Sequence, residues 1–473
     1  MSRTIKATLR RWSFRGEAVV EPDGMRPLVV WQGIPGEDAA VQVVRAGKNQ
    51  LYAHWMKARD PHEDRVHPVC ERYTPCGGCP WMHLNEDAQQ RGHSSLLRQA
   101  MAKQGLDDVE IGALHKSPDG LADFRHVVKV GYGLSRHGKL KLGAWGRHSR
   151  EVVPIPKCVV AAPILNRAMA LLAHLSIELE LEPYDLVSGR GVMRAAVLRA
   201  SRTTGHVLIT LVAGRRTKEL NELAERLETE LSEVVGVWLH LNDDEGNNLF
   251  QRNETGGVGV RHLSGRSFIE EQVGDICYRI GPGDFFQTNP SVAVPLYDRA
   301  LELLELDPEE GLLDLYCGVG GLALQAAPRV AYVLGVEENP GAIRMAQETA
   351  QRHKSKASFQ ASVVQDALEG LKARFKGTPH TVIVNPARRG LEEGVVEGVA
   401  ELEPRRVAYI SCNPKAFARD LKRFRDRGFT VGEVEIFEMF PNTPHMEILG
   451  VLHGPVREGG PKRRSPRRKV VHS

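Results

Sequence analysis

The sequence predicts an α/β protein made of three folded domains and a basic tail. Two patterns carry this prediction: short apolar runs separated by Gly, Pro and Asp fill residues 1–58, and strand-like runs alternate with amphipathic helices from about residue 281. A length of 473 residues also indicates two or three domains. We expect a small N-terminal β-barrel, a central α/β domain and a C-terminal Rossmann-like domain whose sheet is parallel or mixed.

The composition is that of a globular protein. The chain is 42% hydrophobic and 26% charged, and it contains neither a run of about 18 apolar residues nor an apolar signal segment after Met1. We therefore expect a cytoplasmic protein without a membrane partner, and nothing in the sequence indicates an obligate protein partner. The predicted boundaries are 1–58 for the barrel, 59–280 for the central domain, 281–455 for the Rossmann-like domain and 456–473 for a disordered basic tail.

Each domain is predicted from its own series of elements. Barrel strands are expected at 16–20, 28–31, 39–44 and 51–54. The central domain is expected to have strands at 126–132, 192–200, 205–212 and 234–241, and helices at 85–104, 162–180 and 217–231. The Rossmann-like domain is expected to have helices between most of its strands, at 311–316, 330–336, 380–384, 407–411, 431–437 and 446–452.

Positive charge is concentrated in two segments of the chain. Residues 121–160 hold eight Lys and Arg against two acidic residues, and residues 462–469 hold six positive charges. Such segments suit a polyanion, and nucleic acid is the expected partner. The alternative is an ordinary solvated face in the first segment and a disordered tail in the second.

A glycine-rich turn follows the first strand of the Rossmann-like domain. Residues 312–322 have the sequence LLDLYCGVGGL, in which the glycines allow a ligand to approach the backbone at a helix N-terminus. Nineteen positions after Gly318, the next strand ends at Glu337, where a carboxylate typically binds ribose hydroxyls. Because the pattern is not the full dinucleotide fingerprint, it favours S-adenosylmethionine over NAD. We expect Cys317 in this turn to be structural.

Another cysteine, Cys412, ends an apolar strand directly before a helix. Asn413 suits the N-cap of that helix and Pro414 its first position. The free N–H groups and the dipole of a helix N-terminus favour a thiolate, which is the nucleophilic form of cysteine. The alternative is a small buried residue at a strand end.

Two further loops at strand ends carry polar groups. Residues 384–390 include Arg388 where amino-group methyltransferases place an aromatic ring, which argues against an exocyclic amine as the target. Residues 440–447 include Glu447, a candidate general base whose alternative is a solvent-facing carboxylate. His445 in the same loop has the same two interpretations.

Four cysteines form a set that indicates a metal site. Cys70, Cys76 and Cys79 lie on one short loop in which two glycines allow the chain to wrap, and Cys158 lies further along the chain. Four thiolates suit either a [4Fe–4S] cluster or tetrahedral zinc, and the spacing alone does not choose between them. The alternative is four unrelated free thiols. Seven cysteines in a chain of this length are an improbable disulfide framework.

Together these motifs resemble those of the RNA uracil-C5 methyltransferase family, in particular its bacterial 23S ribosomal RNA branch. The matching stretches are 285–289 (FFQTN), 314–318 (DLYCG), 385–390 (NPARRG), 411–414 (SCNP) and 439–447 (MFPNTPHME). The resemblance covers nearly the whole chain except the tail, and the barrel resembles the RNA-binding TRAM domain of that family. It implies methylation of uracil C5 in 23S ribosomal RNA with S-adenosylmethionine as methyl donor.

By position, the resemblance implies a role for each motif residue. Cys412 would be the nucleophile and Glu447 the base. The residues expected to line the methyl-donor site are Gln287, Tyr316, Glu337, Asp366 and Asn385. The expected ligands of a [4Fe–4S] cluster, which the resemblance favours over zinc, are Cys70, Cys76, Cys79 and Cys158.

Two positions depart from the family's pattern. Many members have Asp where this chain has Asn385, and an amide cannot accept a proton as a carboxylate can. Asn385 is therefore expected to orient uracil or the cofactor by hydrogen bonds. Gly321 stands where some members have a polar cofactor contact, so it is left out of the expected site.

The chemistry of uracil agrees with the resemblance. Uracil C5 is a poor nucleophile towards a sulfonium methyl group, and a thiolate that adds to C6 makes C5 carbanion-like. This route needs one activated cysteine and one nearby carboxylate, as Cys412 and Glu447 provide. A target base inside folded RNA must also be flipped out or already unpaired.

Three alternatives remain beside the 23S ribosomal RNA prediction. A transfer-RNA uracil-C5 methyltransferase is the nearest one, although that branch generally resembles this chain without the barrel and the cysteine set. A non-catalytic iron–sulfur RNA-binding protein is less compatible with the presence of Cys412, Glu447 and Gln287. A methyltransferase of another base is disfavoured by Arg388 and by the cysteine and glutamate pair.

Overall fold

The computed structural model describes residues 4–22, 24–244, 248–251, 257–375 and 380–455. The predicted disordered tail, 456–473, lies outside the described residues. The helices within the described ranges are α1 (Glu86–Ala102), α2 (Pro163–Glu178), α3 (Glu219–Glu230), α4 (Pro290–Leu303), α5 (Gly321–Ala326), α6 (Pro340–Arg352), α7 (Val364–Phe375), α8 (Val395–Glu401) and α9 (Pro414–Asp426).

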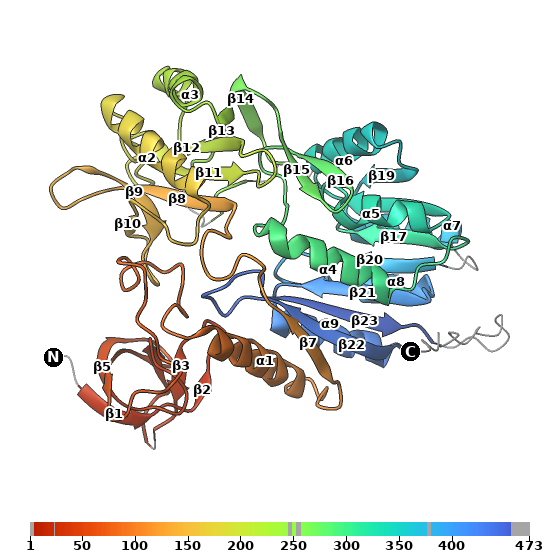
Figure 1. Cartoon of the computed structure of the whole chain (residues 1–473), viewed down its shortest axis with the longest axis horizontal. Coiled ribbons are helices and arrows are strands. Elements are labelled where there is room, and N and C mark those ends of the chain that lie inside the picture. Colours follow the sequence, from red (N-terminus) through yellow and green to blue (C-terminus); the bar gives the residue numbers. More distant parts are fainter. Residues whose placement is uncertain (1–3, 23, 245–247, 252–256, 376–379, 456–473) are drawn as a thin grey trace, which may run out of the picture.

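The N-terminal segment forms one mixed sheet, drawn in red in Figure 1. Its six strands in the described part of the chain, in the order β1-β5-β6-β4-β3-β2, are β1 (Thr4–Thr8), β2 (Arg11–Trp12), β3 (Ala18–Val20), β4 (Leu28–Trp31), β5 (Asp38–Ala46) and β6 (Leu51–Ala58). Leu9, Leu28 and Val41 are fully buried in its core. The sequence predicted β3 to β6 but missed β1 and β2, because these strands at the two sheet edges are short and largely polar.

The central segment forms a second sheet, which is antiparallel apart from the β12–β13 pair. Its order over the described residues is β10-β9-β8-β11-β12-β13-β14, and its strands are β8 (Val127–Leu134), β9 (Leu140–Trp145), β10 (Val152–Pro154), β11 (Met193–Ala200), β12 (Val207–Ala213), β13 (Val234–Leu241) and β14 (Val260–Gly265). Helices α2 and α3 pack against it and share its core. A hairpin of β15 (Ile269–Val273) and β16 (Ile276–Ile280) leads out of this region.

The C-terminal segment alternates strands and helices, as predicted. Its sheet, over the described residues, has the order β19-β18-β17-β20-β21-β23-β22-β7. The strands are β17 (Gly311–Leu315), β18 (Tyr332–Glu337), β19 (Ala357–Ala361), β20 (His380–Val384), β21 (Arg406–Ser411), β22 (Thr430–Phe437), β23 (Glu447–His453) and β7 (Ile111–His115). From β19 to β21 the neighbours are parallel, so their carboxyl ends meet at one edge, where α/β proteins usually bind ligands.

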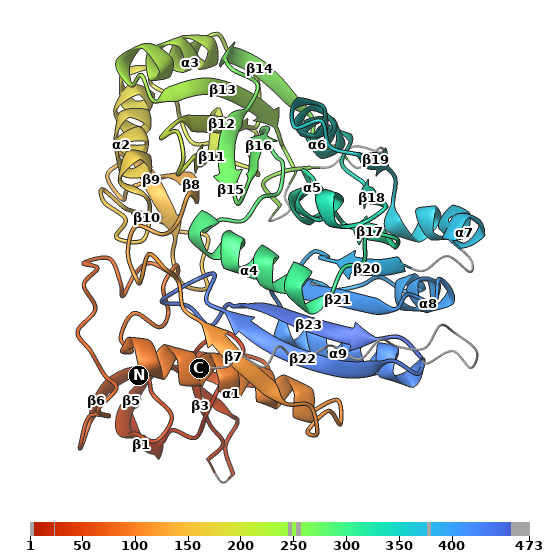
Figure 2. The same ribbon diagram turned by 45° about the vertical axis from the view of Figure 1, so that its right-hand side comes forward.

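Two segments of the predicted central domain pack instead with the C-terminal sheet. Strand β7 pairs in parallel with β22, and helix α1 packs against α9. One continuous core joins Trp12 of the N-terminal sheet, Trp81, helix α1 and the C-terminal sheet. Figure 2 shows α1 and β7 beside β22 and α9. None of the helices in the described residues combines the length and the apolar character needed to cross a bilayer.

Candidate active site

The sheet topology brings the predicted nucleophile and base together. Strands β21 and β23 are antiparallel neighbours, with Ser411 opposite Ile448. Cys412 directly follows the last residue of β21 and Glu447 is the first residue of β23, so both lie at the carboxyl edge of the parallel strands. The charge of Glu447 raises the pKa of the Cys412 thiol, as expected for side chains that face each other. Two residues that are 35 positions apart in the sequence therefore share one site.

Cys412 lies at the strand-to-helix junction that the sequence predicts. The Asn413 side chain caps α9 by accepting the Lys415 N–H at 3.1 Å, and it donates to the Arg388 carbonyl at 2.8 Å. Burial first, and then Glu447, raise the pKa of Cys412 to about 12, although Arg388 opposes this shift. Burial and the neighbouring carboxylate therefore act against the thiolate that the helix N-terminus favours.

Glu447 is a buried carboxylate rather than a solvent-facing one. Only 4% of it is exposed, and burial raises its pKa to about 8. The solvent-facing alternative is therefore excluded. A pKa near the working pH suits a general base, because a useful fraction is ionised and the ionised form still binds a proton readily.

The loop before Glu447 is held from both sides. Helix α1 supplies Gln89, whose side chain accepts the Asn442 N–H at 2.7 Å, and His93, whose Nε2 lies 2.8 Å from the Thr443 carbonyl. From the cysteine loop, the Trp81 N–H donates to the Asn442 carbonyl at 2.9 Å. Buried polar side chains far apart in the sequence thus fix the backbone that leads into the candidate base.

His445 in this loop is neutral and faces Arg388. The Arg388 guanidinium lies 3.2 Å from Nδ1 of His445, and burial, followed by the charges of Arg388 and Arg125, lowers the pKa of His445 to about 4. His445 therefore acts as a hydrogen-bond acceptor that orients Arg388. The arginine is directed towards the site and lowers the pKa of Cys412.

The glycine-rich turn after β17 has the geometry of a ligand-binding loop. Gly318 and Gly320 adopt φ of +55° and +82°, which favour glycine, and Tyr316 before them has φ of +65°. The Tyr316 hydroxyl donates to Glu392 at 2.5 Å. Glu337 at the end of β18 accepts the N–H groups of Gly318 and Asn339, at 3.2 and 2.9 Å.

Some of the predicted donor-site residues come together at this turn, and one does not. Tyr316 and Asn385 line one small cavity, and Glu337 reaches the same turn through Gly318. Gln287 is 3% exposed in the loop before α4. Asp366 lies exposed in the first turn of α7 and is not part of the cavity wall.

Asp314 is a site residue that sequence reasoning missed. It lies in the wall of the same cavity, accepts the Ala323 N–H at 2.9 Å, and is 2% exposed. Burial raises its pKa to about 7. The available signal was a carboxylate inside an otherwise apolar strand directly before the glycine-rich turn.

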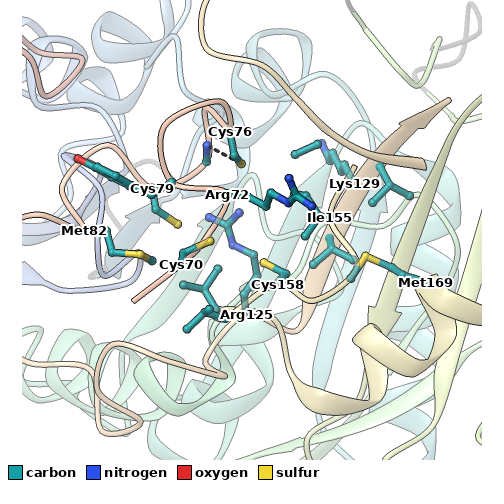
Figure 3. A pocket seen from close by; sticks show the side chains of 17 residues that line it. Cys70, Arg72, Cys76, Cys79, Met82, Arg125, Lys129, Ile155, Cys158 and Met169 are labelled. Atoms are coloured by element: carbon teal, nitrogen blue, oxygen red, sulfur yellow. Dashed lines mark hydrogen bonds between the residues drawn. The ribbon is translucent and has the colours of Figure 1, made fainter. Parts of the chain in front are cut away.

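The four predicted metal ligands line a single pocket of about 80 Å³. Figure 3 shows Cys70, Cys79 and Cys158 directed into one space beside Arg125, with Cys76 on a neighbouring turn of the loop. Apolar side chains of Tyr73, Met82, Phe124 and Val160 enclose it. The loop and Cys158, which is about 80 positions away, are therefore brought together by the fold.

The donor set of this pocket fits a metal cluster. Burial raises the pKa of Cys79 to about 12, Arg125 opposes the shift, and Cys158, Cys76 and Cys70 add to it. Thiols that oppose one another's ionisation become compatible ligands once cations lie between them. Among the described residues no group of three or more His, Cys, Asp or Glu side chains is already gathered closely enough to hold a metal ion.

A basic cleft of about 610 Å³ leads to the active-site loops. Arg15, Arg125, Lys129, Arg147, Arg388 and His445 are among its lining residues. Glu17 is the one carboxylate in the described lining, and it is paired with His148 at 3.0 Å. Arg125 and Lys129 also line the cysteine pocket, so the two share a wall.

Comparisons with known proteins find RNA methyltransferases. Residues 266–454 match the family model described as tRNA (uracil-5-)-methyltransferase. An uncharacterised RNA methyltransferase of Listeria monocytogenes serotype 4b is 28% identical over 460 residues, which are 96% of this chain and 98% of that protein. Another, from Chlorobaculum tepidum, is 29% identical over 452 residues, which are 90% of this chain and 91% of that protein.

A solved structure resembles nearly the whole chain. It is the Pyrococcus abyssi tRNA (uracil-54, C5)-methyltransferase in complex with S-adenosyl-L-homocysteine, at a TM-score of 0.73 and 25% identity. The likeness covers 95% of this chain and 100% of that one. The family match covers the segment that holds Cys412, Glu447 and the glycine-rich turn, and over this segment the chain is similar to uracil-5-methyltransferases that act on RNA.

Proposed function

We propose that this protein transfers a methyl group from S-adenosylmethionine to C5 of a uridine in 23S ribosomal RNA through a covalent adduct with Cys412. The observation that supports the proposal is that Cys412 follows β21 and the buried Glu447 begins its antiparallel neighbour β23, close enough for the charge of Glu447 to act on the thiol. Uracil-C5 methylation needs these two groups together: a nucleophile for C6 and a base for the C5 proton.

The reaction uses the two groups in sequence. The Cys412 thiol passes its proton to ionised Glu447 as the sulfur forms a bond to uracil C6, and the electron pair of the C5–C6 double bond moves towards O4, so that C5 becomes nucleophilic. Glu447 releases this first proton to solvent before the C5 proton has to be removed. S-adenosylmethionine supplies the methyl group that C5 takes up. Glu447 then removes the C5 proton, the double bond re-forms, and the thiolate leaves. Arg388, which lowers the pKa of Cys412, stabilises the negative charge that develops near the sulfur.

The residues around the glycine-rich turn fit a methyl donor with a ribose and a charged amino-acid part. Glu337 is positioned by two backbone N–H groups to accept ribose hydroxyls. We assign Tyr316, Asn385 and Gln287 to the wall of the methyl-donor site. We assign Asp366 to the outer rim of that site, near the adenine of the donor. Because Asn385 carries an amide, its role is to orient bound groups by hydrogen bonds.

The cysteine pocket and the N-terminal sheet complete the proposal. Cys70, Cys76, Cys79 and Cys158 would hold a [4Fe–4S] cluster, which fits their shared pocket and mutual charge. The N-terminal sheet would act as a TRAM-like RNA-binding barrel next to the basic cleft, to which it contributes Arg15. Protein purified without oxygen should contain iron and sulfide; stoichiometric zinc without iron contradicts the cluster assignment.

Transfer RNA is the second candidate substrate, and one observation favours it. The Pyrococcus abyssi neighbour, whose name specifies tRNA, matches 95% of this chain. A whole-chain architecture of this kind therefore occurs in a tRNA enzyme, and the presence of the N-terminal sheet does not by itself select ribosomal RNA. The resemblance of the motifs to the 23S ribosomal RNA branch is what supports ribosomal RNA.

The deciding experiment maps 5-methyluridine in ribosomal and transfer RNA from cells with and without the gene. We expect a uridine of 23S ribosomal RNA to lose its methyl group when the protein is absent. Loss of 5-methyluridine only in tRNA would mean that the substrate is tRNA, while the proposed reaction would stand. In vitro, RNA that contains 5-fluorouracil should trap an adduct on Cys412, because the fluorine cannot leave as a proton. No loss in either RNA and no adduct would overturn the proposed function.

A further inference from the structure

A second groove opens beside the basic cleft and shares lining residues with it. Its volume of about 730 Å³ is in the range of ligand-sized depressions. The side chains that matter for its chemistry are Lys129, Trp145, His148, Arg150, Tyr184 and Arg194. They come from β8, β9, the turn before β10 and the segment that leads into β11.

The groove is continuous with the basic cleft. Lys129, Trp145 and His148 line both. The cleft in turn reaches Arg388 and His445 at the candidate active site. A polymer whose reacting unit lies near Cys412 can therefore extend through the cleft, pass Trp145 and enter the groove without leaving the protein surface.

The wall between cleft and groove is held in place from two sides. The Gly77 N–H of the cysteine loop donates to the Trp145 carbonyl at 3.3 Å, and Cys76 forms a β-bridge with Gly146. On the other side, His148 lies 3.0 Å from Glu17 and stacks on Trp31 of the N-terminal sheet, with 5.5 Å between ring centres. This turn is thus organised before a ligand arrives, which lowers the cost of binding.

Both aromatic rings of the groove rest on glycines. A Cβ on Gly131 would come within 2.9 Å of the Trp145 ring, and a Cβ on Gly214 within 2.4 Å of the Tyr184 ring. The backbone therefore supports one face of each ring directly. Both aromatic residues are only partly buried and line the open groove. Flat rings held in this manner are platforms on which nucleic-acid bases stack.

The charge of the groove is positive. Its described lining contains Lys129, Arg150 and Arg194 and no carboxylate. Burial, followed by Arg199 and Arg125, lowers the pKa of Lys129, so this cation lies among other cations. Asp243 and Asp244 act on Arg194 from outside the lining, and Arg150 repels it. An anionic polymer would relieve this repulsion.

We propose that this groove binds a single-stranded stretch of the substrate RNA that flanks the target uridine, with bases on Trp145 and Tyr184 and phosphates at Lys129, Arg150 and Arg194. The inference rests on the proposed function, since it takes the substrate to be RNA. It adds that the enzyme needs several unpaired nucleotides on one side of the target. An acidic protein segment would match the charge, but it would not use two flat, supported rings.

The test measures binding of the full-length protein to labelled oligouridylates of about 5 and about 15 nucleotides, since single-strand sites span roughly this range. The short RNA cannot occupy cleft and groove together, whereas the long one can. Tyr184→Ala should weaken binding of the long RNA by roughly 5- to 150-fold and leave the short RNA nearly unchanged. Arg150→Ala should lower the salt dependence for the long RNA by about 0.7 in log–log slope.

Two variants serve as controls. Tyr184→Phe keeps the ring and should bind both RNAs as the wild type does. Lys356→Ala removes an exposed cation between α6 and β19, away from the groove, and should have no effect. The groove assignment would be overturned if Tyr184→Ala weakened binding of both RNA lengths equally. It would also be overturned if neither Tyr184→Ala nor Arg150→Ala changed binding of the long RNA, or if polyglutamate bound in a manner that depends on Tyr184.

A parallel methyl-transfer assay separates this inference from the proposed function. If the wild type methylates ribosomal or transfer RNA while Tyr184→Ala binds the long RNA normally, only the groove assignment fails. If the wild type methylates no RNA, the proposed function fails whatever the binding data show.

Discussion

The two cysteine sites of this protein differ in what keeps their thiols protonated. At Cys412 burial and one carboxylate, Glu447, raise the pKa to about 12. In the cysteine pocket the pKa of Cys79 is raised to about 12 as well, but after burial the groups that add to the shift are the other three thiols. The pKa values are raised equally, but the two sites can lose their protons in different ways. A thiol next to a base can pass its proton to that base. Thiols next to one another ionise together only when cations bind between them.

The sites also differ in how the chain builds them. Cys412 lies at a regular junction between a strand and a helix, and sheet register supplies Glu447. The cysteine pocket consists of loops, enclosed by apolar side chains from three separate segments. The link between the two sites is the Trp81 N–H bond to Asn442, which joins the cysteine loop to the loop before Glu447. The following predictions test this division of roles.

Replacing the nucleophile should have the largest effect. In Cys412→Ala the C6 adduct cannot form, so methyl transfer should fall by about 10⁴-fold or more. The measurement is single-turnover transfer of a labelled methyl group to RNA. Cys277→Ala is the matched control, because Cys277 lies in β16, outside the candidate active site and the cysteine pocket. Transfer at the wild-type rate by Cys412→Ala would contradict the covalent route.

Replacing the base should stop the reaction at a later step. In Glu447→Gln the C5 proton remains, so turnover should fall by about 10²- to 10⁴-fold. Protein–RNA adduct should accumulate, which denaturing gel electrophoresis detects as a slower band. A variant that is slow and leaves no adduct would show that removal of the thiol proton, rather than of the C5 proton, limits its reaction.

Removing one pocket cysteine should act on the active site at a distance. Cys79→Ser should lose iron, and because Cys79 is two residues from Trp81, methyl transfer should fall by about 100-fold through displacement of the Glu447 loop. Iron analysis and the transfer assay measure the two effects. Cys277→Ser, outside both sites, should keep iron and activity. If the Cys79→Ser variant lacked iron but kept full activity, methyl transfer would not depend on the cysteine pocket.

The rate should also depend on pH through Glu447. A base must be ionised, and the pKa of Glu447 is about 8, so kcat/KM should rise by about tenfold per pH unit from about pH 6 and level off above about pH 8. The Cys412 thiol does not add a second rise in this range if it passes its proton to ionised Glu447 within the site. A profile that is flat between these values would remove Glu447 from the proton transfers.

Loosening the brace from helix α1 should have the smallest effect. Gln89→Ala removes two hydrogen bonds to Asn442, at 2.7 and 3.3 Å, and should lower kcat by about tenfold with little change in KM. Gln99→Ala on the same helix is the control, because the Gln99 Oε1 has no hydrogen-bond partner among the described residues. Equal effects of both variants would point to helix stability rather than to loop position.

Local sequence patterns predicted the parts of the site that depend on local structure. The strand end before Cys412, the Asn413 cap and the position of Glu337 at the end of β18 each depend on a single strand and the helix that follows it. Sheet burial of Glu447 was not predictable, because it depends on β23 being inserted between β21 and β22. Burial of Cys412 and the charge of Glu447 also raise the pKa of the Cys412 thiol, whereas the helix N-terminus alone predicted a lowered pKa.

Sequence patterns did not predict contacts between segments that are far apart in the chain. Neither the brace from Gln89 to Asn442, 353 positions apart, nor the two supported rings of the RNA groove leaves a periodic signal in the sequence. Strand β7 was missed because none of its five residues is fully buried and its partner lies at the other end of the chain. Tertiary context decides such elements.

The pairing of β7 with β22 sets the order in which the molecule can be completed during synthesis. His115 and Glu435 lie 2.6 Å apart in space but 320 positions apart in the chain. Strand β7 is the first strand of the C-terminal sheet to be synthesised, and its partner β22 is one of the last. Strand β7 therefore stays unpaired until β22 has been made. Contacts of such long sequence separation form slowly, so a nascent chain exposes the edge of β7 for most of its translation.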